Sequence, residues 1–230
     1  MYNSSPDAQA GAIIFGTSKI AISGASVGGD VVTMTMLDSK GLKLVPPSMW
    51  VQLDALSIAP ASGASKPLAM ARANYIIDSG TSLTLLTADA FASLDSVFCS
   101  NIIGAVSGTN MTVACGANGD AASHGYIISL SGSDLPTTDQ LNSIFPNISF
   151  SFSTASAAVN FKPSIYMNYK GKTSTSNQFI YQVHIGKSTE TTGLLGNAWM
   201  ADWLIQQTIS TRQLVMTSVK SCNDISYSAA

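Results

Sequence analysis

Residues 75–86 read YIIDSGTSLTLL, and the one carboxylate in this stretch, Asp78, stands between two apolar runs. The flanking runs are typical of buried strands, because they are apolar and rich in β-branched or aromatic residues. Asp-Ser-Gly on its own is also ordinary turn chemistry, since all three residue types favour turns. The stretch therefore has two interpretations: a turn between two strands, or a carboxylate held at a strand end because chemistry takes place there.

The residues after Asp78 supply the hydrogen-bond donors that a partly buried carboxylate needs. Burying an ionised carboxylate is costly unless donors surround it. Gly80 can bring backbone N–H groups close, because it has no side chain in the way. Four hydroxyl groups also follow within six residues, those of Ser79, Thr81, Ser82 and Thr84. This pattern predicts a site that holds the Asp78 carboxyl in a defined orientation.

The rest of the chain reads as mostly β with a few short helices. Alternating or apolar runs bounded by Gly, Ser or Pro predict strands at 11–16, 30–37, 49–59, 145–153, 158–163, 177–185 and 212–219. The segments 104–135 and 170–178 read as loops. We find neither a repeat of fixed period nor a shift in composition, so we expect residues 1–230 to form a single unit.

The clearest helix follows the Asp78 segment directly. Thr87 is a suitable N-cap and Asp89 lies in the first turn. The apolar side chains expected on one face are those of Ala90, Phe91, Leu94, Val97 and Phe98. A second helix is expected at 137–145, ended by Pro146, and one or two helical turns at 197–203.

Composition narrows the classes of partner. Only 10% of the residues are charged, 46% are hydrophobic, and the formal net charge is −2. This balance offers no positive field for a nucleic acid. No run of 18 apolar residues occurs, so we expect no membrane span.

The sequence gives mixed indications about the cellular compartment. The composition suits an extracellular or lumenal β-rich protein. Three sequons, at Asn3, Asn110 and Asn147, also favour a secreted glycoprotein. The opening residues MYNSSPDAQA have none of the features of a signal peptide.

Cysteine and histidine positions do not favour a metal site. The three cysteines, Cys99, Cys115 and Cys222, have no zinc or redox spacing. One arrangement is a local disulfide between Cys99 and Cys115, with Cys222 free or paired elsewhere; the alternative is three buried thiols. His124 and His184 have no neighbours that would suggest a catalytic or metal site. We therefore expect no metal and no cofactor. Trp50, Trp199 and Trp203 are expected in the core.

The extended pattern around Asp78 resembles a known active-site segment. Two apolar residues, Asp78-Ser79-Gly80-Thr81-Ser82, an apolar run and then a helix resemble the C-terminal lobe of the pepsin-like aspartic proteases, peptidase family A1. A second block, 191–219, resembles a late block of the same lobe, with matches at Leu194, Leu195, Gly196, Trp199 and Trp203. GAIIFG (11–16) and the strands within 145–167 resemble further blocks in the same order.

The resemblance implies a fold and an activity. It implies a mostly β acid-protease lobe, with antiparallel sheets around a psi-shaped active-site loop, and it implies that the chain is the C-terminal lobe without its N-terminal lobe. Asp78 would be one of two catalytic aspartates that share a proton and activate water for hydrolysis of a polypeptide substrate. The implied compartment is secreted, or the lumen of a vacuole or lysosome.

The resemblance also implies roles for the neighbours of Asp78. Ser79 would lock the two active-site loops together across the lobe interface. Gly80 would donate its N–H to the carboxylate, Thr81 would hydrogen-bond its outer oxygen, and Ser82 would contact the substrate backbone. Leu194, Leu195 and Gly196 would brace the active-site loop from behind.

The sequence departs from the family pattern in two respects. It contains only one Asp-Ser/Thr-Gly triplet, and Asn197 stands where the family usually has Asp. Three hypotheses follow. The chain is an endopeptidase lobe that needs an N-terminal lobe, a homodimer in which two copies of Asp78 face each other as in retroviral proteases, or a non-catalytic binding or inhibitor protein on the same scaffold.

Overall fold

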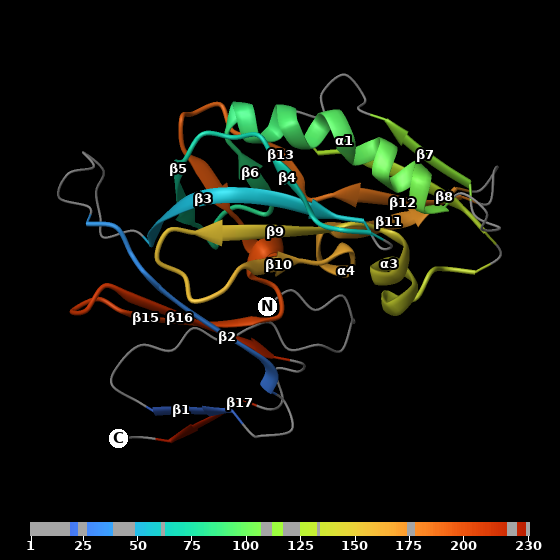
Figure 1. The fold of residues 1–230 in the computed structure, drawn as a ribbon. Helices are drawn as coiled ribbons and strands as arrows, with labels where there is room; N and C mark the ends of the chain where they lie inside the picture. The colour runs from blue at the N-terminus through green and yellow to red at the C-terminus, as the bar shows by residue number, and fades with distance from the viewer. Residues whose placement is uncertain are drawn as a thin grey trace.

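The computed structural model describes residues 19–22, 27–38, 49–60, 63–106, 112–116, 125–132, 134–173, 178–219 and 225–228. This part of the chain is mostly β, as the sequence predicted. Figure 1 shows the helix α1 on one side of the sheets and the strands β2, β15 and β16 on the other.

The largest sheet has eight strands and contains both flanks of Asp78. Its neighbouring strands, in order, are β10 (Val159–Phe161), β9 (Asn147–Phe152), β3 (Trp50–Ala59), β5 (Ala73–Ile77), β14 (Gly193–Leu195), β6 (Thr84–Leu86) and β13 (Ile185–Lys187), while β4 (Lys66–Leu68) pairs with β3. The strand β14 pairs with β5 in parallel and with β6 in antiparallel orientation. The segment that joins β5 to β6 therefore lies at one end of a strand inserted from more than a hundred residues later in the chain.

Three smaller sheets complete the strands. The four-stranded sheet has the order β11 (Met167–Lys172), β12 (Gln178–Val183), β8 (Ile127–Ser131) and β7 (Thr112–Gly116). The three-stranded sheet has the order β15 (Trp203–Thr208), β16 (Gln213–Val219) and β2 (Val27–Thr35), and β1 (Lys19–Ile22) pairs with β17 (Ile225–Ser228).

The helix predicted after the Asp78 segment is present as α1 (Ala88–Val106). Of the five side chains expected on its apolar face, Ala90, Phe91, Leu94 and Phe98 are buried and Val97 is partly buried. The Thr87 carbonyl accepts the N–H of Phe91, which makes Thr87 the residue that precedes the first turn. The sequence pattern therefore located both the start of this helix and its buried face.

The other helices are short. The helix α3 (Thr138–Ile144) begins with a capping box, in which the Thr137 hydroxyl accepts the N–H of Gln140 and the Gln140 side chain accepts the N–H of Thr137. The helices α4 (Pro163–Tyr166) and α5 (Asn197–Met200) are single turns. The helix predicted at 137–145 is thus confirmed, and the one at 197–203 is confirmed for its first turn only.

One continuous hydrophobic cluster joins the eight-, four- and three-stranded sheets to α1. Trp50, Trp199 and Trp203 all belong to the buried set, which confirms their predicted place in the core. Trp199 of α5 makes edge contacts with the rings of Phe150 and Phe152. Such contacts add to the free energy gained by burying the rings.

Several predicted boundaries were wrong. The segment 104–135 is not a loop throughout, because α1 continues to Val106 and both β7 and β8 lie within it. The strand β11 covers the first three residues of the expected loop 170–178, and α4 begins where the strand at 158–163 was expected to end. The expected strand at 11–16 lies outside the described residues.

Candidate active site

Asp78 lies directly after β5, at the start of the segment 78–83 that leads into β6. Its backbone N–H donates to the Leu195 carbonyl of β14 (3.0 Å), and its carbonyl accepts the N–H of Thr81 (3.3 Å). The side chain is only partly buried. Asp78 is therefore fixed by the sheet on its backbone side, and its carboxylate is reachable from solvent.

Two donors hold the Asp78 carboxylate, one on each oxygen. The Gly80 N–H donates to Oδ1 (2.8 Å) and the Thr81 hydroxyl donates to Oδ2 (2.6 Å). Both hydrogen bonds are those that the family resemblance implied. An ionised carboxylate only accepts hydrogen bonds, so the pair of donors fixes its orientation.

Glycine is required at position 196 behind this segment. A Cβ on Gly196 would lie 2.2 Å from the Leu83 carbonyl oxygen and 2.4 Å from that of Thr81. The residue that follows, Asn197, donates its N–H to the Thr81 carbonyl (2.7 Å). The backbone of 195–197 therefore contacts the segment 78–83 directly and braces it, as the family resemblance implied for Leu195 and Gly196.

Ser79 and Ser82 present exposed side chains at the same segment. Ser82 contacts the brace through its carbonyl, which accepts the Ala198 N–H (3.4 Å). Within the part of the chain that the structure describes, neither serine hydroxyl makes a hydrogen bond. Their predicted roles, in joining a second loop and in contacting substrate, stay predictions.

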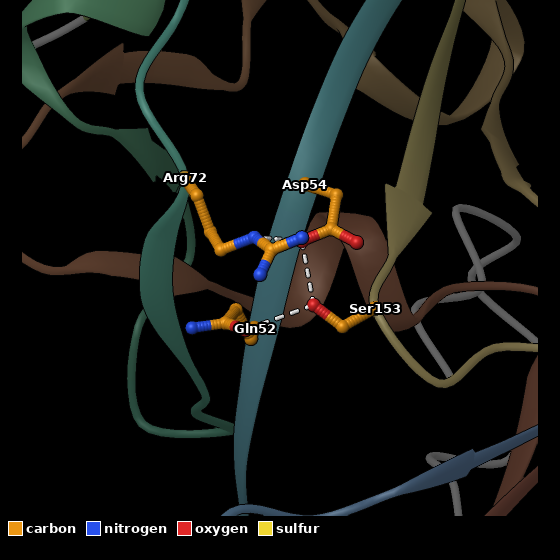
Figure 2. A network of polar contacts seen from close by, with 4 residues as sticks. All are labelled: Gln52, Asp54, Arg72 and Ser153. Carbon is orange, nitrogen blue, oxygen red and sulfur yellow. Dashed lines mark hydrogen bonds and ion pairs between the residues drawn. The ribbon is translucent and has the colours of Figure 1, made fainter.

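No second carboxylate is hydrogen-bonded to Asp78 among the described residues. Asp54 of β3 binds elsewhere: its Oδ1 pairs with Arg72 Nε (2.6 Å) and accepts the Ser153 hydroxyl (2.5 Å). Figure 2 shows this network, in which Ser153 also contacts Gln52. Because Leu53 pairs with Ala73 at the first residue of β5, Asp54 lies at the end of β5 away from Asp78.

The remaining chemistry-bearing residues do not gather at Asp78. No group of three or more His, Cys, Asp and Glu side chains that could hold a metal ion occurs within the described ranges. Burial, with a smaller effect from Lys170, lowers the pKa of His184 from its ordinary value of 6.5. His124 lies outside the described residues.

In the described part, none of the helices has the length and apolar character needed to cross a bilayer.

The cysteine and glycosylation predictions are only partly addressed. Cys99 of α1 packs at the margin of the core, and α1 lies against β7, the strand that contains Cys115. The pairing of Cys99 with Cys115 stays a prediction that this proximity favours. The Asn147 sequon lies in β9, where the residue is half-buried and its amide oxygen is buried.

The sequence pattern missed a second feature, a cavity of about 780 Å³ at the end of β5 and β6 away from Asp78. It is lined by three segments: 71–73, 87–89 and 187–191. These are far apart in the sequence and none carries a recognisable motif. Only the chain folding that brings β13 beside β6 places them together.

No known protein family matches the chain, and no curated protein matches it either.

Proposed function

We propose that this chain is a lobe of an aspartic-type endopeptidase that contributes one catalytic carboxylate, Asp78, and needs an N-terminal lobe for the other. The observation that carries the proposal is the way the Asp78 carboxylate is positioned. Each of its oxygens accepts one hydrogen bond, and the segment that contains it is braced by the backbone of 195–197 and exposed on its other side. An ordinary turn does not require all three features together.

The arrangement of strands around Asp78 supports the proposal. The insertion of β14 between β5 and β6 gives the psi-shaped outline that the family resemblance implies for the active-site loop. The exposed hydroxyls of Ser79 and Ser82 are available to a second lobe and to a substrate backbone.

The proposed chemistry needs two carboxyl groups that share one proton. Two carboxylates a few ångström apart do not both ionise readily, so the pair has one member protonated and one charged. The charged member takes a proton from a water molecule as the water attacks the peptide carbonyl carbon, and the protonated member gives its proton to the carbonyl oxygen. Asp78 supplies one of these groups, and Gly80 and Thr81 keep it in position.

A lone lobe is expected to have no complete substrate cleft, because the cleft of a two-lobed enzyme lies between the lobes. The segments that line the cavity at the other end of β5 and β6 do not include 78–83. That cavity is therefore not assigned to catalysis.

Hydrolysis of a fluorogenic peptide mixture at acid pH tests the proposal. The chain is assayed alone and with a separately produced N-terminal lobe of a pepsin-like protease. We expect no hydrolysis by the chain alone, and hydrolysis with the added lobe that falls by at least about a thousandfold in Asp78→Asn, as for loss of an essential catalytic group. The matched control is Asp139→Asn, which removes an exposed carboxylate from the first turn of α3 and should leave the rate unchanged.

The other hypotheses predict different outcomes in the same assay. A homodimeric protease would hydrolyse peptides alone, at a rate that rises with the square of the chain concentration at low concentration. Hydrolysis that persists in Asp78→Asn would contradict the proposed role of this residue. Absence of hydrolysis under every condition would favour a non-catalytic binding protein.

A further inference from the structure

The cavity at the end of β5 and β6 away from Asp78 has the size of a small-molecule site. Sites for small ligands have volumes of roughly 300–1,000 Å³, and this cavity measures about 780 Å³. In Figure 1 the start of α1 lies close to β6 and β13, the strands whose ends lead into two of the lining segments. The wall is built from the ends of β5, β13 and α1 together with the irregular segments 71–72 and 188–191.

Charges of both signs line the cavity, and two of them, on exposed side chains, form no ion pair among the described residues. Arg72 is paired with Asp54, and the Asp89 carboxylate accepts the Ala71 N–H (2.5 Å). Lys187 and Glu190 form no ion pair with any residue that the structure describes. An ammonium and a carboxylate are therefore both available to a ligand from the short segment 187–191.

Hydroxyl groups supply further polar contacts in the same lining. Ser188, which lies between the two unpaired charges, is 5% exposed and accepts the N–H of Glu190 through its hydroxyl (3.1 Å). The Thr87 side chain is 4% exposed. Together with the Ala71 N–H it helps to lower the pKa of the Asp89 carboxyl from its ordinary value. Its Oγ1 nevertheless makes no hydrogen bond of standard geometry. A buried hydroxyl in this state gains free energy when a ligand supplies a partner.

The lining excludes several ligand classes on chemical grounds. No aromatic side chain lines the cavity, so a sugar or a nucleobase would have no ring to stack on. The lining carries two basic and two acidic side chains, Arg72, Lys187, Asp89 and Glu190, so it does not favour a ligand with charge of one sign only. The apolar part of the wall consists of the small side chains Ala71, Ala73 and Ala88.

We propose that this cavity binds a short peptide with free termini, whose ammonium group pairs with Glu190 and whose carboxylate pairs with Lys187. A zwitterion of this kind satisfies both unpaired charges together, and its peptide groups can bond to the hydroxyls of Thr87 and Ser188. The alanine methyl groups accommodate small side chains. The site involves no residue of 78–83, so the proposal of a peptide site does not depend on whether Asp78 is catalytic.

Calorimetric titration of the full chain with four forms of trialanine tests the site. The forms have both termini free, the amino end acetylated, the carboxyl end amidated, or both ends blocked. We expect the free peptide to bind most tightly, each single block to weaken binding by about tenfold, and the doubly blocked form not to bind.

Two variants assign each terminus to its partner. Lys187→Gln should weaken binding of the free peptide about tenfold but leave binding of the amidated peptide unchanged, since that peptide has no carboxylate to lose. Glu190→Gln should weaken the free peptide equally and leave the acetylated peptide unchanged. The matched control is Lys170→Gln, at an exposed lysine of β11 outside the cavity lining, and it should bind all four forms as the natural chain does.

Thr87→Val distinguishes binding of the peptide inside the cavity from a general attraction between its charges and those of the protein. This change removes only the buried hydroxyl, and it should weaken the free peptide while the melting temperature is maintained. Equal binding of all four peptide forms, no binding of any, or variants that weaken every form alike would each overturn the proposal. Binding that Asp78→Asn abolishes would place the peptide at Asp78 instead.

Discussion

The two ends of β5 and β6 differ in how their polar groups are satisfied. At the Asp78 end, both carboxylate oxygens have donors, and the backbone of 195–197 bonds to the segment from behind. At the cavity end, Lys187 and Glu190 have no ion-pair partner in the described chain, and the Thr87 hydroxyl has no well-formed hydrogen bond. The same two strands therefore support one end where the carboxylate is fully paired within the chain and one end where two charges and a buried hydroxyl are not.

This difference teaches where fixed geometry is needed. A catalytic carboxylate works only when its orientation is set before substrate arrives, so the protein itself supplies the donors. A binding cavity keeps some polar groups unpaired, because the ligand supplies their partners and gains affinity from them.

The largest expected effect is from Gly196→Ala, which would break the Asp78 end. The added Cβ would overlap two backbone carbonyl oxygens, and backbone cannot give way as a flexible side chain can. We expect a loss of about 3 kcal/mol or more in the free energy of unfolding, measured by urea denaturation. Gly132→Ala is the control, because its Cβ would meet only one atom, at 3.7 Å, and it should change stability little. Equal stability of the two variants would contradict the proposed brace.

Thr81→Val tests the donor on Asp78 Oδ2. The variant keeps the shape of the side chain and removes a 2.6 Å hydrogen bond to a carboxylate. Such bonds contribute about 1.5–3 kcal/mol, and partial exposure places the expected loss of unfolding free energy near the lower limit. Thr81→Ser should restore most of the loss, because it returns the hydroxyl. If Thr81→Ser restores none of the lost unfolding free energy, the packing of the Thr81 methyl group, and not its hydrogen bond, stabilises the fold.

Tyr75→Phe tests the cavity end of β5 and β6. The Tyr75 hydroxyl oxygen is buried and accepts the Thr87 N–H (3.2 Å), so its removal leaves that donor without a partner. We expect a loss of about 1 kcal/mol in thermal or urea unfolding. Thr84→Val is the contrasting variant, since its buried hydroxyl has no partner in the described structure, and it should be neutral or stabilising. A larger loss in Thr84→Val than in Tyr75→Phe would reverse this assignment.

The smallest effect concerns pH and His184, which accepts the Thr84 N–H through its carbonyl at the start of β6 (3.0 Å). Burial lowers the pKa of His184 in the folded chain below the ordinary value of 6.5. The unfolded chain therefore takes up the proton first, and the stability present above pH 6.5 is lost as the pH falls through the folded-state pKa. Melting temperatures from pH 7.5 to pH 5 should fall more for the natural chain than for His184→Gln. Parallel curves would show that His184 does not titrate differently on folding.

Local sequence patterns predicted the elements that depend on neighbouring residues. The helix after Thr87, the strand at 49–59 and the helix after Thr137 were all predicted, because the spacing of apolar residues and, at Thr137, a capping box set them. The strands β7 and β8 were missed because Gly, Ser and Asn dominate the segment around them. Their pairing with each other and with β12 makes them strands.

The sequence by itself determined the hydrogen bonds at Asp78: the carboxylate, Gly80 and the Thr81 hydroxyl lie within a few residues, so these bonds are local. Only the tertiary structure decided what lies behind and beyond that segment. The strand β14 enters between β5 and β6 from the far part of the chain, and β13 pairs in parallel with β6. Strand pairing over such separations depends on the free energy of the whole core, which no local pattern encodes. The brace at Gly196 acquires its contacts, and the cavity its walls, only when those pairings form.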